Sequence, residues 1–343
     1  MIGRTTLAGG YELSRIIKGG WHLAGGHGEI DRVAAKRDMA QFVDAGITTF
    51  DCADIYTGVE ELIGEFRTEY PSHAAKVQVH TKFVPDLDIL GRIERDYVER
   101  IIDRSLTRLR VQCLDLVQFH WWDYAVPRYV ETALELERLR RAGKIANIGV
   151  TNFDVPRLAE LIAAGVPIVS HQLQYSVLDR RAEHGMAAYC KQHGIGLLCY
   201  GTVAGGFLSE RWIDVPEPTG DLANRSLTKY KLIIDDSGGW PAFQLLLAGL
   251  SLVAARHDCD IATIATSYIL TRASVCAAII GATNVLHLPA HEKLGRVRLG
   301  ATEISDIDAL VAGHQGPRGD VYDLEREREG RHGRIMKYNL SAT

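Results

Sequence analysis

Short runs of apolar and β-branched residues recur along the chain, separated by longer stretches in which apolar residues follow a helical repeat. The short runs predict buried strands, since a strand covered on both faces reads as a continuous apolar segment. The longer stretches carry apolar residues three and four apart, as at Val98, Ile101 and Ile102, and this spacing predicts amphipathic helices. Strands are expected at residues 16–20, 47–51, 77–81, 114–120, 145–151, 168–172, 196–200 and 275–280.

Each predicted strand is followed by at least one predicted helix. Helices are expected at residues 34–45, 60–69, 97–109, 130–141, 155–164, 181–193, 241–257, 261–271 and 285–294. Regular alternation of this kind predicts an α/β protein in which parallel strands close into a (β/α)8 TIM barrel. The rival, an open doubly wound sheet, requires a Gly-x-Gly-x-x-Gly turn after its first strand, and Lys18-Gly19-Gly20-Trp21 does not provide one.

Two segments depart from the alternation, and they suggest how the chain is organised. Residues 205–239, after the seventh predicted strand, hold Pro216, Pro218 and Gly220 and are too long for a plain connection, which predicts an active-site loop. The charged run at residues 323–329 alternates in sign and is interpreted as a solvated helix with ion pairs. We therefore expect one barrel over residues 1–312 and a tail, residues 313–343, that packs on or near it.

Composition narrows the class of protein. Hydrophobic residues make up 46% of the 343 positions, which excludes an intrinsically disordered chain. The formal charge of −4 gives no reason to expect a nucleic acid or an anionic membrane as partner. No apolar run reaches the roughly 20 residues of a membrane span, and residues 1–4 do not begin the apolar run of a signal peptide, so neither is expected. The six scattered cysteines lack a Cys-x-x-Cys pair, so we expect free thiols and a cytoplasmic location.

Ionisable side chains follow three neighbouring predicted strands. Asp51 and Tyr56 come at the end of the second strand, Lys82 at the end of the third and His120 at the end of the fourth. The carboxyl ends of barrel strands meet at one mouth, so these residues are expected to converge there. A tyrosine has a pKa near 10, a lysine beside it stabilises the phenolate, and a carboxylate keeps that lysine charged. The set suits protonation of an oxygen while another group delivers hydride, although each residue alone also fits a turn, surface or core position.

Several motifs resemble those of the aldo-keto reductase superfamily over about residues 14–294. They are Asp51-x-Ala53-x-x-Tyr56 with Gly58-x-Glu60-x-x-Ile63-Gly64, then Ile148-Gly149-Val150-Thr151-Asn152-Phe153, Gln172-Leu173-Gln174-Tyr175, and Gly205-Gly206-Phe207-Leu208. The resemblance implies an NAD(P)-dependent oxidoreductase that interconverts a carbonyl (aldehyde, ketone or sugar) and an alcohol. It also implies that the nicotinamide cofactor lies across the barrel mouth without a Rossmann fold.

Carried over by position, the resemblance assigns roles to individual residues. Tyr56 is expected to be the general acid and base, Lys82 to lower its pKa, Asp51 to support Lys82, and His120 to orient the carbonyl. The substrate is expected to meet Trp21, Tyr56, His120 and Trp121. Cofactor contacts are expected from Gly19, Gly20, Asp51, Thr151, Asn152, Gln172, Tyr200, Gly201, Thr202, Val203, Gly205, Gly281, Ala282, Thr283, His287 and His291.

The sequence departs from the family pattern where the adenosine ribose is expected. His287 stands where an arginine is common, and the downstream Glu-Asn pair is replaced by Ala290-His291. A missing arginine weakens a clamp for a 2′-phosphate, which protonated His287 and His291, or Lys293 and Arg296, would have to replace. We expect NADP(H) to be favoured, with NAD(H) as the alternative. The two histidines also have a spacing that suits zinc, but no third ligand is evident, so no metal site is expected.

Two other functions remain open at this stage. A nicotinamide-binding barrel with little turnover would act as a regulatory or interaction subunit, and the intact set of four ionisable residues argues against it. A barrel hydrolase or lyase would need paired strand-end carboxylates or a metal cluster, and the sequence suggests neither. The expected partner is a small-molecule carbonyl or alcohol. The sequence indicates no particular substrate, reaction direction or oligomeric state.

Overall fold

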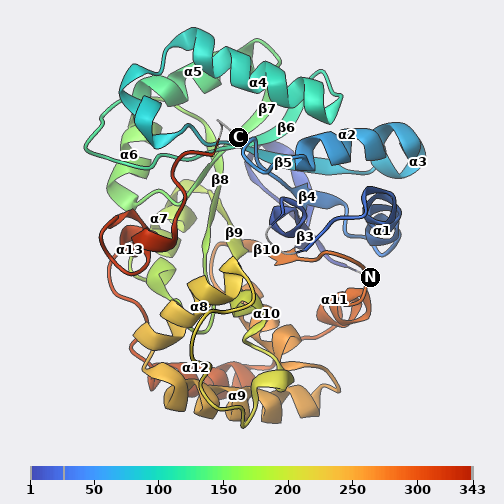
Figure 1. The fold of residues 1–343 in the computed structure, drawn as a ribbon, viewed down its shortest axis with the longest axis vertical. Helices are drawn as coiled ribbons and strands as arrows, with labels where there is room; N and C mark the ends of the chain where they lie inside the picture. Colours follow the sequence, from blue (N-terminus) through green and yellow to red (C-terminus); the bar gives the residue numbers. More distant parts are fainter. Residues whose placement is uncertain (1, 26–27, 341–343) are drawn as a thin grey trace.

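The computed structural model describes residues 2–25 and 28–340. Within them, eight parallel strands close into a barrel in the order β10-β3-β4-β5-β6-β7-β8-β9, and helices surround it (Figure 1). The (β/α)8 prediction is confirmed. Residues 1 and 343, the outer limits of the predicted barrel and tail, lie outside the described residues. The barrel strands are β3 (Ile16–Gly19), β4 (Thr49–Asp51), β5 (Gln78–Phe83), β6 (Leu114–Phe119), β7 (Ile145–Thr151), β8 (Ile168–Gln174), β9 (Gly196–Tyr200) and β10 (Val275–Gly281).

Local signals in the sequence explain where several helices begin. The side chains of Asp31, Asp154 and Asp260 each accept hydrogen bonds from backbone N–H groups in the first turn of α1, α6 and α10. The helices are α1 (Arg32–Asp44), α2 (Val59–Glu69), α3 (Pro71–Ala74), α4 (Arg95–Leu109), α5 (Tyr129–Arg141), α6 (Val155–Ala163), α7 (Met186–His193), α8 (Arg225–Asp236), α9 (Gly239–Arg256), α10 (Ile261–Leu270), α11 (Leu288–Leu294), α12 (Ala301–Ala312) and α13 (Asp323–Arg326).

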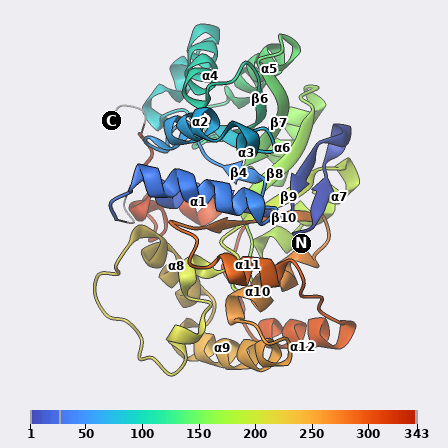
Figure 2. The ribbon, with the colours of Figure 1, turned by 90° about the vertical axis from the view of Figure 1, so that its right-hand side faces the viewer.

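An N-terminal hairpin that the sequence patterns did not predict fills one end of the barrel. Its strands, β1 (Arg4–Thr6) and β2 (Glu12–Ser14), pair antiparallel. Leu7 and Leu13 pack against the apolar side chains inside the barrel, and the Tyr11 hydroxyl lies 3.1 Å from Nε2 of His80. Figure 2 shows the hairpin at one end of the barrel and α8 at the other. The hairpin therefore seals the end opposite the mouth.

Two predicted elements differ from the structure. The segment 205–239 is not irregular throughout, because α8 forms within it and the Asn224 side chain accepts a hydrogen bond from the N–H of Leu227. The single helix predicted over residues 181–193 is interrupted. A 3-10 turn at Arg181–Glu183 is followed by Gly185 with φ of 112°, and α7 starts after it. A left-handed backbone of this kind does not continue a helix.

The prediction that residues 323–329 form a solvated helix is wrong for the middle of the run. Helix α13 covers only Asp323–Arg326, and Glu325 within it is fully buried. Its carboxylate lies 3.1 Å from Nη1 of Arg181 and 3.4 Å from Nζ of Lys229, while Arg181 also binds Asp179 at 2.7 Å. Buried charges need such partners to offset the loss of hydration. We call these four side chains the ion cluster, and it fastens the tail to the barrel.

Other features bear on the earlier expectations. Among the described residues, no single helix is long and apolar enough to cross a membrane, and α8 with α9 passes that test only as a pair bent by 96°. All six cysteines are free thiols. In residues 2–25 and 28–340, no three or more His, Cys, Asp or Glu side chains are grouped to hold a metal ion.

Candidate active site

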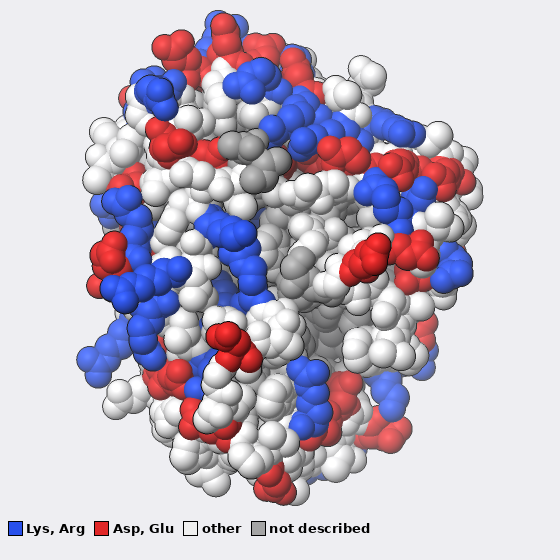
Figure 3. Space-filling model, in the orientation of Figure 1, with Lys and Arg blue, Asp and Glu red and all other residues white. Residues whose placement is uncertain are grey.

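The carboxyl ends of the barrel strands surround a cavity of about 470 Å³, which α8 and the tail also line. Figure 3 shows the mouth face of the molecule hollowed near its centre, with acidic and basic side chains interspersed around the hollow. Most of the residues that the sequence assigned to cofactor, substrate or catalysis line this one cavity. They are Gly19, Trp21, Asp51, Tyr56, Lys82, His120, Thr151, Asn152, Gln172, Tyr200, Gly201, Val203, Gly205 and Gly281.

Asp51 and Lys82 form a fixed ion pair in the cavity wall. Nζ of Lys82 lies 2.7 Å from Oδ2 of Asp51 and 2.8 Å from the carbonyl oxygen of Cys52. The side-chain amides of Gln118 and Gln172 donate to the other carboxylate oxygen at 3.0 and 2.6 Å. Gln118 was not predicted, although it lies in the predicted strand 114–120 two residues before His120, and alternate residues of a strand share a face. All four side chains are buried, so the pair has little freedom to reorient.

Tyr56 faces this ion pair. Nζ of Lys82 lies 4.9 Å from the centre of the Tyr56 ring, and the ring of Trp21 lies 5.1 Å away on the cavity side. Burial raises the pKa of Tyr56, while the ammonium of Lys82 acts in the opposite direction. Burial alone would lower the pKa of Lys82, but Asp51 and Tyr56 raise it above its usual value. The Tyr56 phenol is therefore protonated at neutral pH. The ammonium of Lys82 is positioned to stabilise the phenolate that proton transfer would create.

His120 lines the cavity with a neutral imidazole ring. Its Nδ1 lies 3.2 Å from the carbonyl oxygen of Thr151 and must donate there, because a carbonyl oxygen only accepts. Burial, together with the positive charge of Arg326, lowers the pKa of His120 to about 3, so the ring is neutral. Nε2 is then unprotonated, and it has no hydrogen-bond partner among the described residues. The sequence expected His120 to orient a carbonyl, whereas this tautomer accepts a hydrogen bond from a hydroxyl.

Trp121 does not line the cavity, and Trp122 does. The Trp121 side chain is fully buried, and its indole N–H donates to the carbonyl oxygens of Asp123 and Val126, both at 3.0 Å. The Trp122 ring lies 4.3 Å from that of His120, and its buried Nε1 has no partner in the described part of the chain. Strand β6 ends at Phe119, so the alternation of faces along a strand no longer applies at either tryptophan.

One wall of the cavity fits a flat ring that carries an amide. Asn152, Gln172 and the Tyr200 ring lie along it, and the Tyr200 hydroxyl donates to Oδ1 of Asn152 at 2.9 Å. Next to this wall the backbone bends at Gly201, where φ is 77° and a Cβ would lie 2.5 Å from the Tyr230 hydroxyl. A Cβ on Gly281 would collide with the His22 ring. At both positions the missing Cβ leaves room for a neighbouring side chain, Tyr230 or His22, that itself lines the cavity.

The other predicted cofactor residues lie outside the cavity. The N–H of Gly20 donates to the carbonyl of Asp51 at 2.7 Å, which ties β3 to β4. The Thr202 side chain faces α10, where it meets Thr266 at 3.1 Å. Ala282, Thr283 and His287 follow β10, and of these Thr283 and His287 are exposed.

His291 is buried between α1 and α11, and its ring is stacked 6.1 Å from that of Phe42. Burial lowers the pKa of His291 to about 4, with a further contribution from His287. The ring is therefore neutral at physiological pH. His291 therefore provides no positive charge for a 2′-phosphate, although the sequence analysis expected it to help bind one.

Helix α8 and the tail contribute residues that the sequence did not single out. Nζ of Lys229 lies 5.2 Å from the Tyr200 ring and 5.6 Å from the Tyr322 ring, and all three line the cavity. Burial lowers the pKa of Lys229, and the carboxylate of Glu325 opposes that effect. The unusual length of segment 205–239 predicted that this segment contributes to the active site, but not which of its residues do so.

The chain is similar to known proteins over most of its length. The family model described as "Aldo/keto reductase family" matches residues 15–312. The chain is 27% identical over 312 residues to the aldo-keto reductase YhdN of Bacillus subtilis, covering 88% of this chain and 91% of that protein. It is 26% identical over 297 residues to the NADH-specific methylglyoxal reductase of Escherichia coli, covering 79% and 86%.

A solved structure shares the fold as well. The glycerol dehydrogenase AKR11B4 of Gluconobacter oxydans matches with a TM-score of 0.76 at 24% identity, over 92% of this chain and 97% of that one. The same barrel thus recurs at low sequence identity. The chain therefore belongs to the aldo/keto reductase family, and it is an oxidoreductase acting on carbonyl compounds.

Proposed function

We propose that this protein interconverts a carbonyl compound and its alcohol with a nicotinamide cofactor, and that Tyr56 is the general acid and base. The observation that carries the proposal is the Asp51–Lys82 ion pair, closed at 2.7 Å, with its ammonium 4.9 Å from the Tyr56 ring. The ammonium of this pair stabilises the phenolate of Tyr56, but neither Lys82 nor Asp51 is placed to accept the Tyr56 proton itself. General acid–base catalysis of this kind typically contributes about 10²–10⁴-fold to rate.

The protein side of the reaction follows from these positions. In reduction, the Tyr56 hydroxyl gives its proton to the carbonyl oxygen, and Lys82 stabilises the phenolate that remains. In oxidation the phenolate takes the proton back. Asp51 is not a competing base, because both its oxygens already accept hydrogen bonds from Lys82, Gln118 and Gln172.

The cofactor supplies or accepts the hydride when it is bound. Thr151, Asn152 and Gln172 would hold its carboxamide, and the Tyr200 ring would stack on the nicotinamide and fix the face presented to the substrate. Gly201, Val203 and Gly205 would follow the pyrophosphate. We retain NADP(H) as the favoured cofactor, with the exposed imidazole of His287, and not the neutral His291, as the donor to a 2′-phosphate.

The polar groups without partners suggest the class of substrate. Nε2 of His120 is an acceptor, Nε1 of Trp122 is a donor, and both belong to residues lining the cavity. A buried polar atom without a partner is costly, so a matching substrate gains from both. A plain aldehyde offers no hydrogen to His120. We therefore propose a substrate with a hydroxyl beside its carbonyl, such as a sugar or a hydroxyketone.

The test compares glyceraldehyde with propionaldehyde, which lacks the hydroxyls, with NADPH and NADH and in both directions. We expect Tyr56→Phe to lose at least about a hundredfold in kcat while cofactor affinity, measured by fluorescence titration, stays within about twofold. We expect His120→Phe to lower kcat/KM about tenfold more for glyceraldehyde than for propionaldehyde. Near-normal turnover of Tyr56→Phe would contradict the assignment of the acid. Cofactor binding by the normal chain with no turnover of any carbonyl would instead favour a regulatory subunit.

A further inference from the structure

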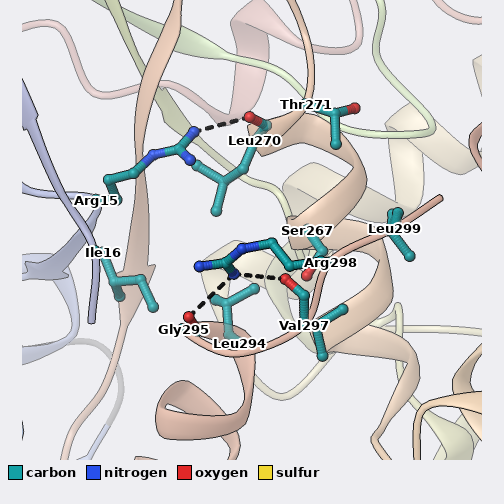
Figure 4. Close-up of a pocket in the computed structure, with 11 residues that line it drawn as sticks. Arg15, Ile16, Ser267, Leu270, Thr271, Leu294, Gly295, Val297, Arg298 and Leu299 are labelled. Carbon is teal, nitrogen blue, oxygen red and sulfur yellow. Dashed lines mark hydrogen bonds between the residues drawn. The ribbon is translucent and has the colours of Figure 1, made fainter. Parts of the chain in front are cut away.

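A second hollow lies at the other end of the barrel wall from the active site. It has a volume of about 170 Å³ and sits between strand β3 and the helices α10 and α11. Arg15 immediately precedes β3, Leu270 ends α10, and Gly295 follows α11. Figure 4 shows Arg15 reaching into the hollow from the strand side and Arg298 from the helix side. None of the residues lining it also lines the active-site cavity.

The hollow contains two positive charges and no negative one. Arg15 donates to the carbonyl oxygens of Leu270 at 2.8 Å and Cys276 at 3.3 Å. Arg298 donates to those of Gly295 at 3.1 Å and Val297 at 2.8 Å. These carbonyls position the guanidinium groups but carry no net charge. Within the described residues neither arginine forms an ion pair, and no acidic side chain lines the hollow.

The two cations also act on each other. Burial lowers the pKa of Arg15, and the positive charge of Arg298 lowers it further. Arg298 is exposed, so only Arg15 has lost hydration, and a bound anion would relieve that loss as well as the repulsion between the two charges. Arginine forks are well suited to this task because they bind planar carboxylates with two parallel hydrogen bonds.

Ser267 supplies a donor that the fold itself does not use. Its side chain lines the hollow and is 6% exposed, and its hydroxyl oxygen has no hydrogen-bond partner among the described residues. A buried hydroxyl without a partner costs free energy, and a ligand in the hollow that accepts its hydrogen would remove that cost. The guanidinium groups also keep unused N–H groups: Nη1 of Arg15, and Nε and Nη2 of Arg298, make no hydrogen bond to the described residues.

Apart from Thr271, the remaining side chains that line the hollow are apolar. Ile16, Leu270, Leu294, Val297 and Leu299 face the same hollow, so a fully hydrated ion such as inorganic phosphate would leave this surface unused. The volume is well below the 470 Å³ of the active-site cavity and excludes a nucleotide-sized molecule. We propose that this hollow binds a small organic carboxylate, with its head between Arg15, Arg298 and Ser267 and a short apolar body against the leucine side chains.

The test is isothermal titration calorimetry of the full chain with butyrate as the probe. Butanol has the same apolar body without the charge, and inorganic phosphate has the charge without the body. We expect saturable binding of butyrate, at least about tenfold weaker binding in Arg298→Gln, and a change below about twofold in Arg296→Gln, an exposed arginine outside the hollow. Ser267→Ala should weaken binding about threefold or more without removing a charge.

Several results would overturn the proposal. They are absence of saturable butyrate binding, equal losses in Arg298→Gln and Arg296→Gln, or butanol binding as tightly as butyrate. Phosphate binding as tightly as butyrate would overturn the organic class of ligand. Because the hollow is remote from the mouth, Arg298→Gln should keep normal carbonyl turnover, which verifies that the variant is folded. The outcome is thus independent of the function proposed for the active site.

Discussion

The ion cluster that fastens the tail makes a quantitative prediction about Glu325. Burial alone would raise the pKa of this carboxyl, but Lys229 and Arg181 lower it to about 2, against 4.5 for a free glutamate. A group that binds its proton less readily when folded stabilises the fold above its unfolded pKa. For this difference the stabilisation is about 3 kcal/mol at neutral pH. Similar losses, of about 3–5 kcal/mol, follow when one partner of a buried ion pair is removed.

We therefore expect Glu325→Gln to lower the free energy of unfolding by about 3 kcal/mol at pH 7, measured by urea denaturation. The difference from the unsubstituted chain should shrink as pH falls from about 4.5 towards 2, because the normal carboxylate is then protonated as well. Since Tyr322 and Lys337 of the tail line the cavity, KM for the carbonyl substrate should also rise.

Glu329→Gln is the matched control. Glu329 lies in the same charged run but is exposed, and its ion pair with Arg334 spans 3.6 Å at the surface, so its loss should cost less than about 1 kcal/mol. The reasoning is refuted if Glu325→Gln costs no more than this control. It is also refuted if the cost stays constant between pH 7 and pH 3.

Three further predictions follow from other parts of the structure. Lys82→Met removes the charge that opposes the effect of burial on the pKa of Tyr56, so the rate of alcohol oxidation should fall at least about tenfold and its rise with pH should occur at least about one pH unit higher. An unchanged pH–rate profile would count against this coupling. His291→Gln should alter the ratio of kcat/KM for NADPH to that for NADH by less than about twofold, because the ring is neutral and outside the cavity, and a tenfold loss for NADPH alone would show the opposite. Leu13→Ala should cost about 2–5 kcal/mol of stability without changing KM, whereas a rise in KM would mean that the hairpin reaches the site.

The barrel was predictable because its strands and helices carry strong periodicities of their own. The ionisable set was predictable for a related reason, since strand ends in a barrel converge and bring Asp51, Lys82 and His120 to one cavity. Gln118 was within reach of the same argument, because side chains alternate along β6. The hairpin was not, because strands of three residues are too short to show a period.

The errors have a common physical origin in contacts between distant segments. Glu325 reads as a solvated charge because its partner Arg181 is 144 residues away in the sequence. Trp121 and Trp122 are chemically identical neighbours, and only the turn after Phe119 decides which one enters the cavity. Tertiary packing decides both the burial of Glu325 and which tryptophan lines the cavity. The local sequence pattern contains no information about either.

The hairpin at the far end of the barrel has a consequence for the kinetics. Leu7, Leu13 and Tyr11 fill that end, so among the described residues it offers no second entrance through the barrel. When two molecules share one entrance, the one that binds deeper has to bind before the other and dissociate after it. For the cofactor and carbonyl proposed above, a closed end opposite the mouth would impose an order of addition and release, and the first residues of the chain would then influence the kinetics without touching either molecule.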